Sequence, residues 1–457
     1  MNFTSANSYS QPRQFAANSK PSHIRWIVVG FLGVIAALTY IDRLNLGIVA
    51  HSVQQEYRFN TQTMGWILGG FSLGYAIFHV PGGWLGDRFG ARTILALAVL
   101  WWSVFTVLTS VAPKIPVLQY LGAAWSFAVV RFSLGMGEAA AMPLGNKMMA
   151  YWLNEKERAL GTSLFLAGVG AGGIFAPFFV AWIAGHWGWR TSFLTTGVIG
   201  IVVAVASHAF LRNTPEEHSG VNAAELTLIR GSVSSHLRTS ETVKRRVPWL
   251  LLLSSRSVWG LMISHFCLVY PVYIFFTWFF IYLVKVRGLA IPKASFWTAT
   301  PFVANLILVP LWGWLSDTAA EKLGKHRGRQ TTVWLGVICS AAFMWSGIHT
   351  SNNTWALVQL SAAAGFNFAA SAVLWATCND VTAHFSGSVS GLMTTFGSLG
   401  GWLSPVLTAV LVTKFGWLTA LDFAALLTIV SGVAWLLVEP DRRIEMALSN
   451  EKSSIAQ

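Results

Sequence analysis

The sequence predicts an all-α integral membrane protein with twelve transmembrane helices arranged in two six-helix halves. Three observations lead to this prediction. The 457 residues are 54% hydrophobic and only 11% charged, with a mean hydropathy of +0.55, whereas a soluble protein carries about 25% charged residues. Apolar stretches of about 20 residues, the length that crosses a bilayer, recur along the chain. The second half of the chain also repeats landmarks of the first.

The apolar stretches fall into two sets, separated by a polar and basic segment. The first set is expected at residues 25–50, 62–85, 93–112, 118–145, 159–184 and 192–211. The second set is expected at residues 258–284, 294–315, 331–349, 355–377, 387–411 and 416–438. The predicted organisation is a disordered cytoplasmic tail (1–23), an N-terminal six-helix bundle (24–211), a cytoplasmic central loop (212–257), a C-terminal six-helix bundle (258–438) and a cytoplasmic tail (439–457).

Basic residues between the spans predict the orientation, because cytoplasmic loops of membrane proteins carry an excess of Lys and Arg. This excess falls in the tails and the even-numbered loops, so both termini are expected on the cytoplasmic side. The N-terminal tail lacks the apolar stretch of a signal peptide, and the segment from Ile24 is expected to remain as the first span. The net charge of +13 therefore indicates topology and not nucleic-acid binding. Three cysteines have neither disulfide nor metal spacing and are interpreted as small core residues: Cys267, Cys339 and Cys378.

An offset of about 230 residues relates the two halves. The stretch GGWLGDRFGARTI at 82–94 resembles LWGWLSDTAAEKLGKHRGRQTTV at 311–333, and Asp87 and Asp317 are 230 positions apart. The stretches that start at Gly161 and Gly391 keep the same offset. A repeat of this kind predicts a tandem duplication of a six-span unit in parallel orientation.

The loop after the second span predicts a conformational latch. Its pattern is Gly-x-Leu-x-Asp-Arg-x-Gly-x-Arg. A carboxylate that faces helix N-termini and has Arg partners can hold two helices together and release them again, which a protein with two conformations needs. The alternative is an ordinary basic loop on the cytoplasmic side. The predicted latch residues are Gly83, Asp87, Arg88, Gly90, Arg92 and, in the second half, Asp317.

Twelve spans in two sets of six together with this loop motif resemble the major facilitator superfamily from about residue 24 to 440. Within it, three stretches resemble the anion:cation symporter family, the bacterial carriers of hexonates, hexarates, hexuronates and related organic acids. They are TYIDRLNLG (39–47), RFSLGMGEAAAMP (131–143) and FFTWFFIYLVKVRGL (275–289). The third departs from the family pattern, with Phe280 where proline is usual.

The resemblance implies a secondary transporter and not an enzyme. The expected activity is proton-coupled uptake of an organic anion, such as a sugar acid, by alternating access. No cofactor is expected beyond the coupling ion, H⁺. The expected setting is a monomer that crosses the bacterial inner membrane many times, with the lipid bilayer and a small organic anion as its partners and no nucleic acid.

Four charged residues lie inside the predicted spans: Asp42, Arg43, Arg131 and Glu138. Two acids and two bases can be neutral as a group, which a low-dielectric site requires. Arg131 and Glu138 share a helix face about 10 Å apart, so the gap suits a ligand, a water chain or partners from the first span. Ionisable groups inside a membrane usually serve function. The alternative is a neutral network that fixes the packing of the helices.

The types of these residues predict their roles. A guanidinium binds a carboxylate bidentately and keeps its charge, so both arginines suit an anionic substrate. A buried carboxylate beside them can exchange a proton, and substrate would compete with it for the arginines. The resemblance implies an acid-binding cavity lined by Tyr40, Arg43, Tyr75 and Arg131. It also implies two candidate proton carriers, Asp42 and Glu138. Tyr75 is equally compatible with a core or interface position.

The signal in the second half of the chain is weaker. Trp375, Thr394 and Ser398 are predicted to meet substrate hydroxyl groups, and His79 and His265 are expected to be core or interface histidines. The family's Phe-Asn-Phe-Ala-x-Asn run appears here as MTTFGS, which has fewer amide donors. An aromatic acid or a short dicarboxylate therefore stays open as the substrate. The other hypotheses are an exchanger or exporter of phosphate-like anions and a sensor that binds a solute without moving it.

Overall fold

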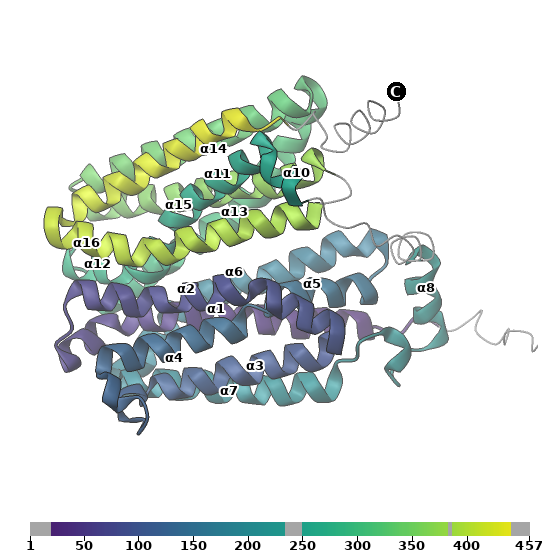
Figure 1. Ribbon diagram of the computed structural model, residues 1–457, viewed down its shortest axis with the longest axis horizontal. Coiled ribbons are helices and arrows are strands. Elements are labelled where there is room, and N and C mark those ends of the chain that lie inside the picture. Colours follow the sequence, from purple (N-terminus) through teal and green to yellow (C-terminus); the bar gives the residue numbers. More distant parts are fainter. Residues whose placement is uncertain (1–19, 234–248, 383–385, 440–457) are drawn as a thin grey trace, which may run out of the picture.

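The computed structural model describes residues 20–233, 249–382 and 386–439, in which long helices run side by side along one axis (Figure 1). The helices of the first half are α1 (Ile24–Tyr57), α2 (Thr61–Phe89), α3 (Ala91–Thr109), α4 (Ala123–Glu138), α5 (Ala141–Trp152), α6 (Glu155–Trp187) and α7 (Trp189–Phe210). The helices of the second half are α11 (Arg256–Thr277), α12 (Phe279–Lys285), α13 (Ile291–Leu323), α14 (Lys325–His349), α15 (Asn353–Val381) and α16 (Ser386–Ala434). The connections contain α8 (Ala223–Val233), α10 (Trp249–Ser254) and four 3₁₀ turns: Ala112–Lys114, Gln119–Leu121, Pro215–Glu217 and Trp435–Leu437.

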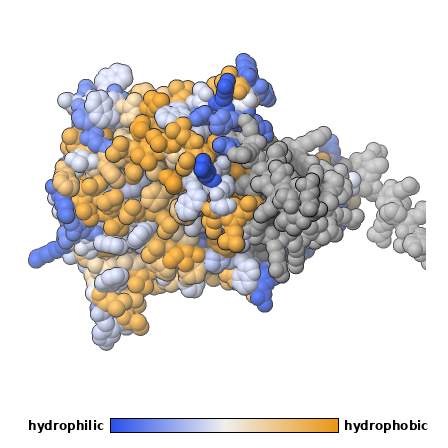
Figure 2. Space-filling view, turned by 45° about the horizontal axis from the view of Figure 1, so that its top comes forward, coloured by the Kyte–Doolittle hydropathy of each residue, from blue (hydrophilic) through white to orange (hydrophobic). Residues whose placement is uncertain are grey.

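Ten helices of the described residues are long and apolar enough to cross a membrane. The all-helical membrane fold is therefore confirmed. On the face drawn in Figure 2, hydrophobic residues cover most of the middle of the molecule, and hydrophilic residues lie at the left edge of the view. Two differences from the predicted spans explain why ten helices meet this criterion and not the predicted twelve. The helix α4 has only 16 residues, and α16 joins two predicted spans into 49 residues across Gly416, whose φ of 86° marks a kink.

The fourth predicted span, 118–145, is wrong in detail. Its first residues form a 3₁₀ turn, and its helix stops at Glu138 before α5 begins at Ala141. Proline has no N–H and removes a hydrogen bond four residues earlier in a helix. Pro143 therefore cannot pair with the carbonyl of Ala139, which lies within the break. The interruption places Glu138 at the last position of α4.

The seventh predicted span, 258–284, is also divided. The break falls at Trp278, between α11 and α12. The indole Nε1 of Trp278 donates to the carbonyl oxygen of Pro405 on α16 at 3.2 Å, so the side chain at the break is held inside the second half. Nothing in the aromatic run FFTWFFIY (275–282) indicates that the helix is interrupted at Trp278.

The helix α8 is tied to the first half through buried charges. The side chain of Glu225 on α8 is fully buried and accepts a hydrogen bond from Nη1 of Arg25 at 2.8 Å and one from the backbone N–H of Arg25 at 3.2 Å. Nη2 of Arg25 also binds Glu157 at the start of α6, at 3.0 Å. The predicted central loop therefore includes a helix fixed against α1. We call this end of the molecule the α8 end, and the opposite end the far end.

Replacing Glu225 by glutamine should destabilise the protein, because it leaves a buried guanidinium with one carboxylate in place of two. Loss of a buried ionic partner costs about 3 kcal/mol at the lower end of the usual range, so we expect the thermal unfolding midpoint in detergent to fall by several degrees. Glu216→Gln is the matched control, since the pair between Glu216 and Arg230 is largely exposed and is worth at most about 1 kcal/mol. Equal shifts for the two variants would contradict a stabilising role for the buried tie.

The two halves meet most closely in the middle of the molecule and at the far end. The helix α2 packs against α16, and α6 packs against α13. A Cβ atom added to Gly47 would lie 2.6 Å from the carbonyl oxygen of Phe276, and one added to Gly65 would lie 2.6 Å from that of Pro405. Only glycine permits such an approach of backbones. Toward the α8 end, a Cβ at Gly391 would meet no atom within 4 Å. The far end is thus closed by direct backbone packing.

Candidate functional site

The centre of the candidate site is an ion pair between Arg43 on α1 and Glu138 at the end of α4. Nε of Arg43 donates to Oε1 of Glu138, and the side chains are 9% and 0% exposed. Oε2 of Glu138 is buried and has no hydrogen-bond partner among the described residues. The partner from the first span is thus Arg43, and one carboxylate oxygen stays available.

Aromatic rings surround the guanidinium of Arg43. Its Cζ lies 4.6 Å from the ring centroid of Tyr75, 5.1 Å from that of Tyr40 and 5.3 Å from that of Phe71. Each such cation–π contact contributes about 0.5–2 kcal/mol, more when water is excluded. The rings fix the position of the charge, and the hydroxyl group of Tyr75 also lies within hydrogen-bonding reach of the guanidinium. Arginine has five N–H donors and Glu138 occupies one of them, so the guanidinium keeps donors for another anion.

Arg131 also lies over the ring of Phe71. Its Cζ is 5.2 Å from the ring centroid of Phe71, and the residue is only 2% exposed. Nη1 approaches the backbone carbonyl oxygen of Asp42 at 3.5 Å, while Nε has no hydrogen-bond partner among the described residues. Phe71 was not predicted as a site residue, yet both guanidinium groups lie within cation–π distance of its ring.

The side chain of Asp42 points away from Arg43, as the 100° step between neighbouring helical residues predicts. Asp42 is 2% exposed, and its carboxylate faces the hydroxyl groups of Thr106 on α3 and Thr196 on α7. Oδ1 is buried without a hydrogen-bond partner. Asp42 therefore lies inside the first half, whereas Arg43 faces the second half. The charges of Glu138 and Arg131 both act on Asp42, so the four residues form one electrostatic set.

The second half reaches this site through α11 and α13. The ring of Tyr40 meets Phe276 and Phe302 edge to face, with centroids 5.6 and 6.1 Å apart. Tyr273 on α11 is close enough for its hydroxyl group to interact electrostatically with Arg43. Sequence reasoning missed Tyr273 because it lies in a run of aromatic residues, where nothing distinguishes a site residue from a packing residue.

The three residues predicted from the second half lie apart from the arginines. Trp375 is 45% exposed, and its ring is 6.0 Å from that of His265. The hydroxyl of Thr394 donates to the carbonyl of Ser390 on its own helix at 2.7 Å, and Ser398 is buried. Among the described residues, none of the three contacts Arg43 or Arg131 in this conformation. Their assignment to the substrate site stays a prediction.

The two predicted histidines differ in their surroundings. The ring of His79 lies one helical turn from Tyr75, with the ring centroids 5.3 Å apart and the planes tilted by 42°. His265 is 7% exposed and packs against Gly397 and Trp375. Both have a buried Nδ1 without a hydrogen-bond partner in the described part of the chain. The positions agree with the expected core or interface placement.

The latch residues of the first half lie at the α8 end. Gly90 adopts a φ of 90°, lies next to Asn213 and immediately precedes α3. Nε and Nη2 of Arg92 donate to the carbonyl oxygen of His208 at 3.0 and 2.7 Å. Gly83 lies near Pro143 on α5, and Arg88 is exposed over its neighbouring aromatic rings. The backbone of Asp87 belongs to α2, but its side chain lies outside the described residues.

The ion-pair network around Asp317, the residue predicted as a latch in the second half, includes an acid that was not predicted. Nη1 of Arg329 donates to Oδ1 of Asp317 at 2.7 Å, and its Nε donates to Oδ2 of Asp380 at 3.1 Å. Lys325 adds a bond to Asp380 at 2.8 Å. The network joins α13, α14 and α15. The Asp380 position in the repeat corresponds to Ala150 in the first half, so comparing the halves could not have found it.

A comparison with known protein families identifies the class of protein to which this chain belongs. The family described as Major Facilitator Superfamily matches residues 32–405. The chain belongs to the major facilitator superfamily. It is therefore a membrane transporter that crosses the bilayer many times, and not an enzyme.

Proteins with described functions resemble this superfamily member over most of their length. A probable galactarate/D-glucarate transporter of Bacillus subtilis is 29% identical, covering 93% of this chain and 94% of that protein. A probable sulfoacetate transporter of Cupriavidus necator is 28% identical, covering 86% and 88%. A solved structure of a bacterial homologue of the human lysosomal transporter spinster, in an inward-facing and occupied conformation, has a TM-score of 0.74 at 18% identity, covering 92% of this chain and 99% of that one. This superfamily member thus shares its fold with solved transporters, and relatives of its sequence carry organic anions.

Proposed function

We propose that the protein takes up a small organic anion together with a proton, and that its substrate is a sugar acid such as a hexonate, hexarate or hexuronate. The observation that supports this proposal most directly is the buried pair of Arg43 and Glu138. The guanidinium has donors to spare, and the carboxylate has an oxygen without a partner. The carboxylate of a substrate would accept two hydrogen bonds from the spare donors of Arg43, and a proton would bind the free oxygen of Glu138.

Competition for Arg43 would couple the two events. When the substrate carboxylate binds the guanidinium, Glu138 loses its partner in a region that excludes water, and a buried carboxylate without a partner binds a proton. When the proton leaves, Glu138 regains Arg43 and displaces the substrate. The binding of one species thus raises the affinity for the other, which is the reciprocity that symport requires. Arg131, with an unpaired Nε, would hold a second anionic or polar group of the substrate.

The relatives support the substrate class. The probable galactarate/D-glucarate transporter of Bacillus subtilis is named for two sugar acids. A D-galactonate transporter of Escherichia coli, also named for a sugar acid, is 27% identical over 93% of this chain. A second candidate is a short acid with two anionic groups. It is favoured by Thr394 and Ser398 in place of two amides and by the resemblance to the probable sulfoacetate transporter.

We further propose twelve crossings with both termini in the cytoplasm of a bacterial cell. The pair α4 and α5 would make one crossing, the pair α11 and α12 another, and α16 two. Lys and Arg side chains of the described helices are concentrated at the α8 end, which the positive-inside rule assigns to the cytoplasm. The far end would then face the periplasm of the inner membrane. The protein would act as a monomer by alternating access about the midplane.

Purified protein in liposomes tests the proposal. D-glucarate, D-galactonate, D-glucuronate, sulfoacetate and benzoate would be compared as labelled substrates under an inward proton gradient. Accumulation of a sugar acid that stops when a protonophore removes the gradient is the expected result. Counterflow that ignores the gradient would mean exchange, and binding without flux would mean a sensor. Accumulation of sulfoacetate alone would favour the short-acid candidate.

A further inference from the structure

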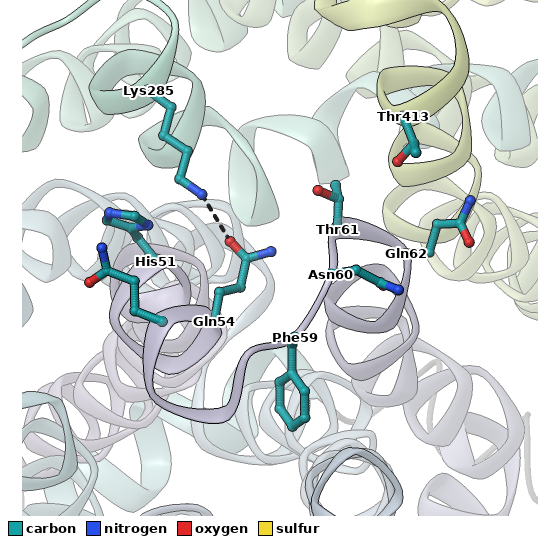
Figure 3. A pocket seen from close by; sticks show the side chains of 9 residues that line it. His51, Gln54, Phe59, Asn60, Thr61, Gln62, Lys285 and Thr413 are labelled. Carbon is teal, nitrogen blue, oxygen red and sulfur yellow. Dashed lines mark hydrogen bonds between the residues drawn. The ribbon is translucent and has the colours of Figure 1, made fainter.

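A polar cavity of about 400 Å³ opens at the far end, away from the arginine site. It lies between the two halves. Its walls come from the end of α1, the start of α2, α12 and α16. Figure 3 shows its lining side chains. They are His51, Gln54, Gln55, Phe59, Asn60, Thr61, Gln62, Lys285 and Thr413.

The side chain of Lys285 crosses from one half to the other. Its amino group donates to Oε1 of Gln54 on α1 at 3.3 Å, and the Gln54 residue is 8% exposed. Figure 3 shows the lysine reaching down from α12 toward this amide. No carboxylate occurs among the described residues that line the cavity, and none pairs with Lys285. The amino group of this lysine is thus held by a neutral amide, and no carboxylate of the described residues pairs with it.

A second feature, the start of α2, gives the cavity the same sign, and His51 adds a polar ring to its wall. His51 faces the charge of Lys285, and its Nδ1 is buried without a hydrogen-bond partner in the described part of the chain. The first residues of α2, a helix of 29 residues, form part of the wall. The N-terminus of a helix carries a partial positive charge of about half an elementary charge. The cavity is therefore polar, open to solvent and positive, with amide and hydroxyl groups around the charge.

We propose that this cavity is an outer anion-binding subsite, in which the carboxylate or sulfonate of the substrate binds at Lys285 before it moves on to the arginines. The inference rests on the proposed function and adds a second place for the same class of anion. A positive, walled cavity raises the local concentration of anions and speeds their capture. Its polar amides suit the hydroxyl groups of a sugar acid. The Lys285–Gln54 bond opens when the anion takes the place of the amide oxygen.

The same bond could instead act only as a tether between the halves. The two roles have different consequences. A tether affects the rate at which the halves change conformation, and hence the maximal rate of transport. An anion site affects the KM at the far side and depends on ionic strength, because salt screens an exposed charge.

A first test does not depend on transport. Thr413→Cys places a thiol in the cavity with Lys285 intact. The rates of its modification by an anionic and a cationic methanethiosulfonate reagent are compared, each divided by the rate of the same reagent with a small free thiol in solution. The parent protein with its native cysteines gives the background. We expect the anionic reagent to react about tenfold faster than the cationic one, and Lys285→Gln to remove this preference. Millimolar D-glucarate should slow both reactions. Gln54→Ala should keep the preference, because it removes only the tether. Equal rates for the two reagents in the Thr413→Cys protein would overturn the proposal.

A second test measures uptake from the far side in liposomes, with the labelled acid that the wild type accumulates. Lys285→Gln should raise KM about tenfold with little change in the maximal rate, and Lys285→Arg should restore KM. Lys414→Gln is the matched control, because Lys414 is an exposed lysine at the same end that does not line the cavity. A lowered maximal rate with an unchanged KM would make Lys285 a tether and refute the subsite. If no acid is transported but the thiol preference holds, the proposed function fails and the anion site stands.

Discussion

Arg131→Lys should reduce uptake by at least about 100-fold while leaving the fold intact. Lysine keeps the positive charge but loses the planar group that stacks on Phe71 and the Nε that has no partner in the structure. It also cannot bind a carboxylate through two parallel hydrogen bonds. Losing two charge-assisted bonds of about 1.5–3 kcal/mol each accounts for a change of this size. Initial rates of proton-driven uptake in liposomes measure the effect.

The control for this variant is Arg256→Lys. Arg256 is exposed at the start of α11, so the same exchange of side chains there should leave uptake unchanged. Both proteins should elute as monodisperse species and unfold at wild-type temperature. Wild-type rates in the Arg131→Lys protein would mean that this arginine does not bind substrate.

Glu138→Gln should abolish accumulation driven by a proton gradient and preserve counterflow of the substrate. Glutamine has nearly the same shape and can still accept the hydrogen bond from Arg43, but it carries no ionisable group. The substrate would then meet no competing charge at Arg43, while the cycle would move no proton. We expect net uptake to become insensitive to the gradient, with exchange at no less than about half of the wild-type rate.

The two carboxylates can be told apart by the same measurement. If accumulation survives in Glu138→Gln, the proton must bind elsewhere, and Asp42→Asn becomes the decisive variant. Asp42 faces threonines inside the first half and does not contact Arg43 through its side chain. We therefore expect Asp42→Asn to keep part of the proton-driven accumulation when Glu138 is intact.

The helical membrane fold and the four buried charged residues could be predicted from the sequence for a physical reason. A charge inside an apolar span is costly, so Asp42, Arg43, Arg131 and Glu138 stand out against their surroundings. Helical geometry also accounts for the shared face of Tyr40 and Arg43 and for the different direction of Asp42. Arg43 contacts both Glu138 and Tyr40 in the structure.

The parts that could not be predicted involve residues that look like their neighbours. Phe71 and Tyr273 are aromatic residues in aromatic surroundings, and only the packing of helices from distant parts of the chain brings them to the arginines. The break at Trp278 likewise depends on a carbonyl of α16. The outer cavity depends on how the ends of α1, α2, α12 and α16 meet, which no local pattern records.

The far end is closed by direct contact between the backbones of the two halves, which Gly47 and Gly65 permit. At Gly47 and Gly65 the backbones of the two halves touch so closely that a single added methyl group has no room. A contact of this kind has no partial state, because van der Waals repulsion rises steeply within a few tenths of an ångström. One alanine at either position would act as a wedge and favour a conformation in which the far end is open. The closure of the far end therefore depends on the backbone shape at these two glycines.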